Sequence, residues 1–265
     1  MTFRSWCCSL PKRGNANAEY EDGYASDPNT RRFAVSDGAT ESSFAAPWAQ
    51  ALVDQFIVQP VRDKDLQVWQ AWLAPLQETW QADIAWEQLP WFATEKAREG
   101  AFSSLVGLEF FPPVEEPRQP LSLHWRAVAV GDSCLFHIRD GALLSAAFPI
   151  KQSKEFSNRP LLLSSNSARN TRLAKAIEVK DSMTDSSPAI IGDRFLLATD
   201  AMAEWFLRRH EDGGQPAKEL APMTDKGYFA EFAKWAAQQR TDGRMRNDDV
   251  TLMTVWCSAD HHPAT

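Results

Sequence analysis

Short apolar runs that end at an aspartate recur along this chain, and they constrain its fold more than any other feature of the sequence. Three such runs are 32–36, which Asp37 follows, 121–130, which Gly131 and Asp132 follow, and 194–199, which Asp200 follows. Asp248 and Asp249 open another run, 250–257. Glu21 and Asp22 precede a further expected strand. Because runs of this length are typical of buried strands, the sequence predicts carboxylates at the ends of short strands.

The link between two of the strands predicts an antiparallel arrangement. Asp140-Gly141 stands between the apolar runs 134–138 and 142–148, and this dipeptide favours a two-residue hairpin turn. The strands fall in groups separated by helical segments rather than in a regular alternation of strand and helix. This order predicts an α+β fold, with antiparallel sheet and helices outside it, in a single domain over 1–265.

Three amphipathic segments predict the helices. Trp48, Leu52 and Phe56 recur every four residues and therefore share one face. Similar spacing runs through 66–80, where Pro75 is expected to kink or split the helix. The third stripe is 229–236, and Thr224 or Asp225 is its expected N-terminal cap.

The charge and the cysteine content argue against several classes of protein. A formal net charge of -7 disfavours broad electrostatic binding to nucleic acid or to an anionic membrane. No signal peptide is recognised, and no apolar stretch approaches the ~20 residues that a membrane span needs. The cysteines are not spaced as a zinc knuckle or a disulfide framework, which favours reduced thiols in a cytoplasmic protein. They are Cys7, Cys8, Cys134 and Cys257.

Carboxylates gathered at one place repel one another, which raises their pKa values unless a cation compensates their charge. Mg²⁺ and Mn²⁺ prefer oxygen ligands, and two such ions can activate a water molecule and hold a phosphoryl group. Gly38 would let its own carbonyl oxygen approach a metal ion closely. The alternative for any single aspartate is a turn former or a helix cap, as for Asp200 ahead of 204–207. As a set, the aspartates predict metal-dependent hydrolysis of a phosphoester.

In order and spacing, the acidic segments resemble the motifs of metal-dependent protein phosphatases of the protein phosphatase 2C type. The matching segments, which lie within 14–255, are Glu21-Asp22, Ser36-Asp37-Gly38, Val130-Gly131-Asp132-Ser133, Ala198-Thr199-Asp200 and Asp248-Asp249-Val250-Thr251. Each is short, but the ordered set is fairly specific. The resemblance implies a four-layer α-β-β-α sandwich, with two antiparallel sheets flanked by helices. It also implies a metal centre along one edge of the sandwich.

The resemblance implies a role for each acidic residue. The implied metal ligands are the side chains of Glu21, Asp37, Asp132, Asp200 and Asp248 and the carbonyl oxygen of Gly38. Asp37 would bridge two Mg²⁺ or Mn²⁺ ions, and Asp132 with Asp200 would hold a third, weaker ion. Asp22 and Asp249 would orient ligands or water. The nucleophile would be a metal-bound hydroxide rather than a side chain.

The sequence departs from the family pattern where the substrate is handled. Asn17 stands where an arginine usually grips the substrate phosphate, and Ala39 stands where many eukaryotic members have a histidine. Bacterial members also lack that histidine, so Ala39 indicates a bacterial-like protein. Arg13, or a basic residue of the flap-like loop region 151–188, is the predicted phosphate clamp; a solvated basic loop is the alternative. The basic residues of the loop include Lys151, Lys154, Arg159, Arg169, Arg172 and Lys175.

These features favour a serine/threonine protein phosphatase that acts on a phosphorylated protein substrate and opposes a kinase in signalling. One alternative is a catalytically silent module that keeps the phosphatase fold and binds a phosphoprotein or regulates a partner. Another is a phosphoesterase for small molecules, which the missing arginine leaves open. All the matched carboxylates are present, and this favours activity. The sequence does not indicate the oligomeric state.

Overall fold

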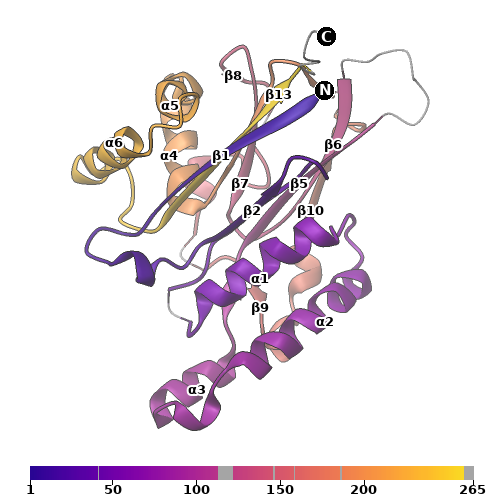
Figure 1. Cartoon of the computed structure of the whole chain (residues 1–265), viewed down its shortest axis with the longest axis vertical. Helices are drawn as coiled ribbons and strands as arrows, with labels where there is room; N and C mark the ends of the chain where they lie inside the picture. The colour runs from indigo at the N-terminus through magenta and orange to yellow at the C-terminus, as the bar shows by residue number, and fades with distance from the viewer. Residues whose placement is uncertain (41, 113–121, 146, 158, 186, 260–265) are drawn as a thin grey trace, which may run out of the picture.

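The computed structural model describes residues 1–40, 42–112, 122–145, 147–157, 159–185 and 187–259, and two antiparallel sheets form its centre (Figure 1). The first sheet has the order β1 (Thr2–Leu10), β13 (Val250–Ser258), β12 (Arg194–Ala198), β7 (Cys134–Arg139) and β8 (Ala142–Leu143). The second has the order β10 (Glu178–Asp181), β6 (Ser122–Val130), β5 (Leu105–Phe111), β3 (Arg32–Ser36) and β2 (Gly23–Asp27), with β11 (Ala189–Ile190) also paired to β6. A separate ladder joins β4 (Phe102–Ser103) to β9 (Leu163–Ser164).

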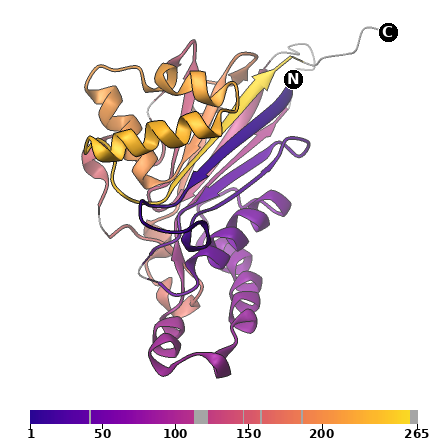
Figure 2. The same ribbon diagram turned by 60° about the vertical axis from the view of Figure 1, so that its left-hand side comes forward.

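Helices cover the outer face of each sheet (Figures 1 and 2). Those beside the second sheet are α1 (Ala45–Val58) and α2 (Leu66–Asp83), followed by α3 (Trp91–Glu99), and those beside the first sheet are α4 (Asp200–Glu211), α5 (Pro216–Thr224) and α6 (Phe229–Thr241). One buried apolar cluster lies between the sheets, and two others lie between a sheet and its helices. The predicted four-layer α-β-β-α sandwich is confirmed. Within the described residues no helix is long and apolar enough to cross a membrane.

The strands alternate between two buried faces. On β3, Phe33 and Val35 belong to the cluster between the sheets, whereas Ala34 belongs to the cluster under α1 and α2. Successive side chains of a strand point to opposite faces, so a strand covered on both sides needs apolar residues at every position. This is why the central strands are visible in the sequence as continuous apolar runs.

The predicted hairpin is confirmed, but its second strand is short. Asp140 and Gly141 both have positive φ, 53° and 76°, as a two-residue turn of the primed kind requires, and Arg139 pairs with Ala142. The strand expected over 142–148 stops at Leu143.

The structure rules out a split of the second helix at Pro75 and the expected cap of the third helix. α2 continues through Pro75 to Asp83, so the proline does not split it. Thr224 and Asp225 do not cap α6, because the chain forms the separate helix α5 that ends at Thr224, with Asp225 at its C-cap. The N-cap of α6 is Tyr228, without a side-chain hydrogen bond.

β1, β5 and β10 are among the strands that lie outside the elements expected from the sequence. β1 mixes polar and apolar residues because it is the edge strand of the first sheet. β5 contains Gly107, which interrupts its apolar pattern, yet a Cβ there would collide with the ring of Phe56 on α1. β10 lies within the region 151–188 that was expected to be a loop.

Candidate active site

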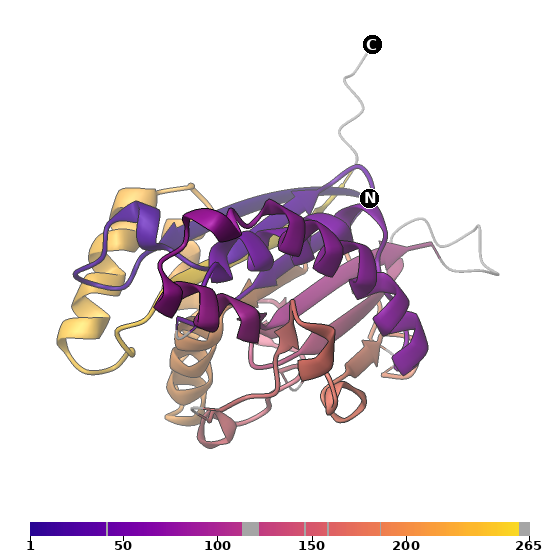
Figure 3. The same ribbon diagram turned by 90° about the horizontal axis from the view of Figure 1, so that it is seen from below.

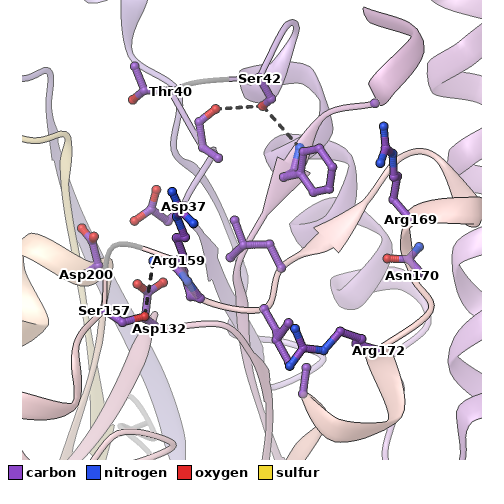
Figure 4. Close-up of a pocket in the computed structure, with 18 of the residues that line it drawn as sticks. Asp37, Thr40, Ser42, Asp132, Ser157, Arg159, Arg169, Asn170, Arg172 and Asp200 are labelled. Carbon is purple, nitrogen blue, oxygen red and sulfur yellow. Dashed lines mark hydrogen bonds between the residues drawn. The ribbon is translucent and has the colours of Figure 1, made fainter. Parts of the chain in front are cut away.

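A pocket of about 620 Å³ opens at the edge where strands of both sheets end, and four aspartates line it. They are Asp37 after β3, Asp132 between β6 and β7, Asp200 after β12 and Asp248 before β13. Figure 4 shows three of them, Asp37, Asp132 and Asp200, close to one another. Because β12 and β13 are antiparallel, the end of the first and the start of the second lie at the same edge. The structure therefore brings four of the predicted metal-binding side chains to one pocket, from both sheets.

Asp249 holds the segment that carries Glu21. Its carboxylate accepts hydrogen bonds from the backbone N–H of Glu21 at 2.7 Å and from that of Lys12 at 2.8 Å. The Glu21 side chain is not among those that line the pocket of the four aspartates. It lies in an adjoining depression, 4.0 Å from the Lys12 ammonium group. Asp249 thus fixes the backbone of this segment, and the Glu21 side chain lies beside the pocket of the four aspartates.

Asp22 is buried beneath this segment. Its Oδ2 accepts the hydroxyl of Thr251 at 2.7 Å, and the hydroxyl of Tyr20 is hydrogen-bonded to the same threonine. Burial raises the pKa of Asp22 well above its ordinary value, and the charges of Asp249 and Asp200 raise it further. Its Oδ1 has no hydrogen-bond partner in the described part of the chain.

Gly38 lets two parts of the site touch. A Cβ at this position would overlap the backbone carbonyl oxygen of Glu21 and lie 3.1 Å from the Cβ of Ala45. Only a residue without a side chain therefore allows the Glu21 backbone to lie against the turn that follows Asp37.

The four aspartates concentrate negative charge in a buried place. Burial raises the pKa of Asp37 well above its ordinary value, and the charges of Asp200, Asp22 and Asp132 add to this effect. Burial, and next the charge of Asp200, raises the pKa of Asp132 to about 7. Burial also raises the pKa of Asp200. Carboxylates in this state are stabilised by a nearby cation.

The chemistry of the donors fits a hard divalent cation such as Mg²⁺ or Mn²⁺, since all of them are oxygens. Asp22 Oδ1 and Asp200 Oδ1 are buried and unpaired among the described residues, so they are free to bind an ion. Over the same residues, no group of three or more His, Cys, Asp or Glu side chains is already arranged to hold a metal ion. The carboxylates would therefore have to draw closer around an ion, whose charge would offset their mutual repulsion.

Arg246 supplies a cation at this site that the sequence analysis missed. Its guanidinium is ion-paired with Asp200 and lies 2.8 Å from Glu204 of α4. It also lines the pocket. No motif marks this arginine; the only signal in the sequence is its position two residues before Asp248, at the edge where the other acidic residues gather.

Basic side chains other than Arg246 also line the pocket. They are those of Lys96 on α3 and of Arg159, Arg169 and Arg172 from the predicted basic loop. In Figure 4, Arg159 lies on the side of Asp37 and Asp132, and Arg169 and Arg172 lie toward the other side. Arg13 and Asn17 are exposed and do not line this pocket. Among the candidates for the phosphate clamp, Arg159 of the loop is therefore the one that lies beside the aspartates, whereas Arg13 lies outside the pocket.

Comparison with known proteins identifies the fold. No protein-family model matches the sequence, and no curated protein matches it. The structure is similar to that of the serine/threonine phosphatase PstP/Ppp of Mycobacterium tuberculosis, with 16% identity, a TM-score of 0.61, and 98% of this chain and 100% of that chain covered. It is also similar to PppA, a regulatory component of the T6SS in Pseudomonas aeruginosa, with 16% identity, a TM-score of 0.56, and 97% and 98% covered.

A third similar structure is that of the PstP catalytic domain in complex with two manganese ions, with 15% identity, a TM-score of 0.55, and 97% and 99% of the two chains covered. The resemblance to the protein phosphatase 2C type is therefore confirmed at the level of the fold.

Proposed function

We propose that this chain is a metal-dependent serine/threonine protein phosphatase, which hydrolyses phosphoric monoesters in phosphorylated proteins. The observation that carries the proposal is the convergence of the carboxylates of Asp37, Asp132, Asp200 and Asp248 on one pocket. Their burial and mutual repulsion call for cations, and the PstP domain with the same fold is known in complex with two manganese ions. A charge-compensated carboxylate centre in this fold is suited to phosphoryl chemistry.

The proposed function assigns one role to the carboxylates and another to Arg159. The four aspartates, with Glu21 and the Gly38 carbonyl beside them, hold two or three Mg²⁺ or Mn²⁺ ions. Bound ions of this kind lower the pKa of a water molecule and offset the charge of the phosphate. Arg159 from the flap-like region 151–188 binds the phosphate in place of the arginine that is absent at position 17, since a guanidinium can take two phosphate oxygens at once.

Turnover of p-nitrophenyl phosphate with Mn²⁺, and again with excess chelator, tests the proposal. We expect turnover only with the ion, and a loss of at least about 100-fold in kcat for Asp37→Asn, because the central carboxylate is lost. The matched control is Asp83→Asn, an exposed acid at the end of α2, which should keep full activity. Full activity of Asp37→Asn, or turnover that the chelator does not reduce, would contradict the two-metal mechanism.

One observation favours the silent binding module as a second candidate. The Arg246 guanidinium already neutralises Asp200, so part of the demand for a cation is met within the chain. If this candidate is correct, the wild-type protein shows no metal-dependent turnover of p-nitrophenyl phosphate, and Arg246→Gln does not restore it.

A further inference from the structure

The pocket carries a second charged region that the proposed hydrolysis does not use. Lys96, Arg169 and Arg172 line the pocket, and Figure 4 shows Arg169 and Arg172 on the side away from Asp37 and Asp132. The chain as a whole has a net charge of -7, so this concentration of positive charge does not follow from composition. In the described part of the chain, the wall has one acid close to these cations, Glu99, and it lies 3.8 Å from Arg169.

These cations are largely free to meet a ligand. Among the described residues, the side chains of Lys96 and Arg172 form no ion pair or hydrogen bond. The one pair, Arg169 with Glu99, has both side chains more than half exposed, at 52% and 66%. Exposed pairs of this kind are weak and exchange readily for a better partner.

The backbone that presents the arginines is held in place. Asn170, which stands between Arg169 and Arg172, is buried and exchanges two hydrogen bonds with the backbone of Ser164, at 2.9 and 3.0 Å. The amide group of Asn166 donates to the carbonyl of Arg98 at 3.0 Å, which ties this segment to α3 and therefore to Lys96. Hydrogen bonds thus fix the backbone of the segments that carry these positive charges.

We propose that the pocket selects phosphorylated segments that carry a second anionic group beside the phosphorylated residue, and that Lys96, Arg169 and Arg172 bind this group. This inference rests on the proposed phosphatase function. The acidic part of the pocket holds the reacting phosphate with its cations, and the basic part takes the second anion. A guanidinium binds a carboxylate and a phosphate by the same paired hydrogen bonds, so the second anion is either an acidic side chain or another phosphate.

Three phosphothreonine peptides that differ only at the flanking positions test this specificity. They carry Glu, its neutral isostere Gln, or phosphoserine there. At low ionic strength we expect kcat/KM of the wild-type protein to be roughly tenfold higher for the Glu peptide than for the Gln peptide, mainly through KM. The ratio should fall as salt is added, because the groups involved are exposed. Hydrolysis is followed at the phosphothreonine alone, by mass spectrometry, because the flanking phosphoserine is itself a phosphoester. Faster hydrolysis of the phosphoserine peptide than of the Glu peptide identifies the second anion as a phosphate, and equal or slower hydrolysis identifies it as a carboxylate.

The double variant Arg169→Gln/Arg172→Gln should reduce the Glu-to-Gln ratio to within about twofold of one. Lys175→Gln is the matched control, since it removes an exposed cation of the same segment that does not line the pocket, and it should keep the wild-type ratio. Equal kcat/KM for the Glu and Gln peptides in the wild type, or an unchanged ratio in the double variant, would overturn the proposal while leaving the phosphatase function intact.

If no peptide is hydrolysed, the proposed phosphatase function is wrong, and a binding experiment then tests the anion-binding subsite by itself. Fluorescence anisotropy with the labelled peptides should then show tighter binding of the Glu peptide, and loss of this preference in the double variant. Equal binding of all three peptides would overturn the subsite as well.

Discussion

Arg246 shows how one side chain outside the motifs can set the properties of a site. It forms ion pairs with Asp200 and Glu204, so a cation already competes for one of the predicted metal ligands. Burial alone would lower the pKa of Arg246, but the charges of Asp200 and Glu204 raise it, so the guanidinium stays charged. The guanidinium pairs with Oδ2 of Asp200 and leaves Oδ1 unpaired among the described residues, so a metal ion on Oδ1 would share this carboxylate with Arg246.

Arg246→Gln should therefore tighten Mn²⁺ binding, by roughly fivefold for the loss of a partly exposed ion pair. Titration calorimetry of the metal-free protein measures this affinity without reference to activity. Arg208→Gln is the control, because Arg208 pairs with Glu204 and not with Asp200. Weaker Mn²⁺ binding by Arg246→Gln would show that the guanidinium supports the site instead of competing for it.

At the residue scale, the sequence predicts the site residues that directly follow a strand, but not the residues that only tertiary packing brings to the site. Asp37 and Asp200 follow their strands directly, so their places at the sheet edge could be read from the chain. Arg246 and Lys96 have no such signal, because the pocket gathers them from segments whose relative positions only the fold determines. Glu21 was expected among the other ligands, but its side chain lies in the adjoining depression.

At the element scale, the close contact between α1 and β2 keeps the Glu21–Asp22 segment near the site. Gly23, which starts β2, packs so tightly that a Cβ would lie 2.6 Å from the backbone of Ala49 in α1. Gly23→Ala should destabilise the protein by about 2 kcal/mol, because helix backbone cannot yield as a flexible side chain can. Urea unfolding measures the loss. Ser26→Ala, at an exposed position of the same strand, should change stability by less than about 0.5 kcal/mol.

A second element-scale contact lies at the start of β12, opposite to the site. The buried Asp193 accepts hydrogen bonds from Arg139 on β7 at 2.7 Å and pairs with His137 at 2.8 Å. Burial alone would raise the pKa of Asp193, but these hydrogen bonds lower it below its ordinary value. The folded state thus favours the ionised carboxylate, and the stability it contributes is present above the ordinary pKa near 4 and lost as the pH falls through the lowered pKa.

Asp193→Asn should cost about 3 kcal/mol at pH 7, since it removes the charge between two partners. It should also weaken the acid destabilisation that we expect of the wild type below about pH 4. Urea unfolding between pH 3 and 7, in roughly unit steps, tests both expectations, with the exposed Asp212→Asn as the comparison. Equal stability of Asp193→Asn and the wild type at pH 7 would contradict this account.

The elements themselves were predictable where local chemistry decides them. Asp140-Gly141 forms its turn because both residues tolerate positive φ, a property of the dipeptide alone. The sequence analysis did not predict β5, because Gly107 interrupts its apolar pattern to make room for Phe56 of α1. The predicted cap of α6 was wrong because α5 ends where that cap was expected. In both cases a tertiary neighbour, absent from the local pattern, determines the outcome.

For the whole molecule, the main consequence is that the site joins the two sheets. Asp37 belongs to the second sheet and Asp200 and Asp248 to the first, so an ion bound by them stabilises only the folded arrangement. Addition of Mn²⁺ at about 100 times its dissociation constant should stabilise the protein by about 2.7 kcal/mol. The midpoint of thermal unfolding should rise by about 5–10 °C and return with chelator.

The same melting experiment on Asp37→Asn provides the control. Its midpoint should respond weakly to Mn²⁺, and in chelator it should be at least as high as that of the wild type, because a buried and repelled carboxylate has been replaced by a neutral amide. A large Mn²⁺ shift that survives in Asp37→Asn would place the ion elsewhere in the protein.

The pairing of β1 with β13 has a consequence for how the chain folds as it is synthesised. The two strands align from Thr2 opposite Ser258 to Leu10 opposite Val250, and among the described strands β1 pairs with β13 alone. A ribosome adds about 5–20 residues per second, so β1 waits for more than ten seconds before its partner emerges. Until then neither the first sheet nor the pocket can close, and the nascent chain exposes an unpaired strand that chaperones would be expected to hold.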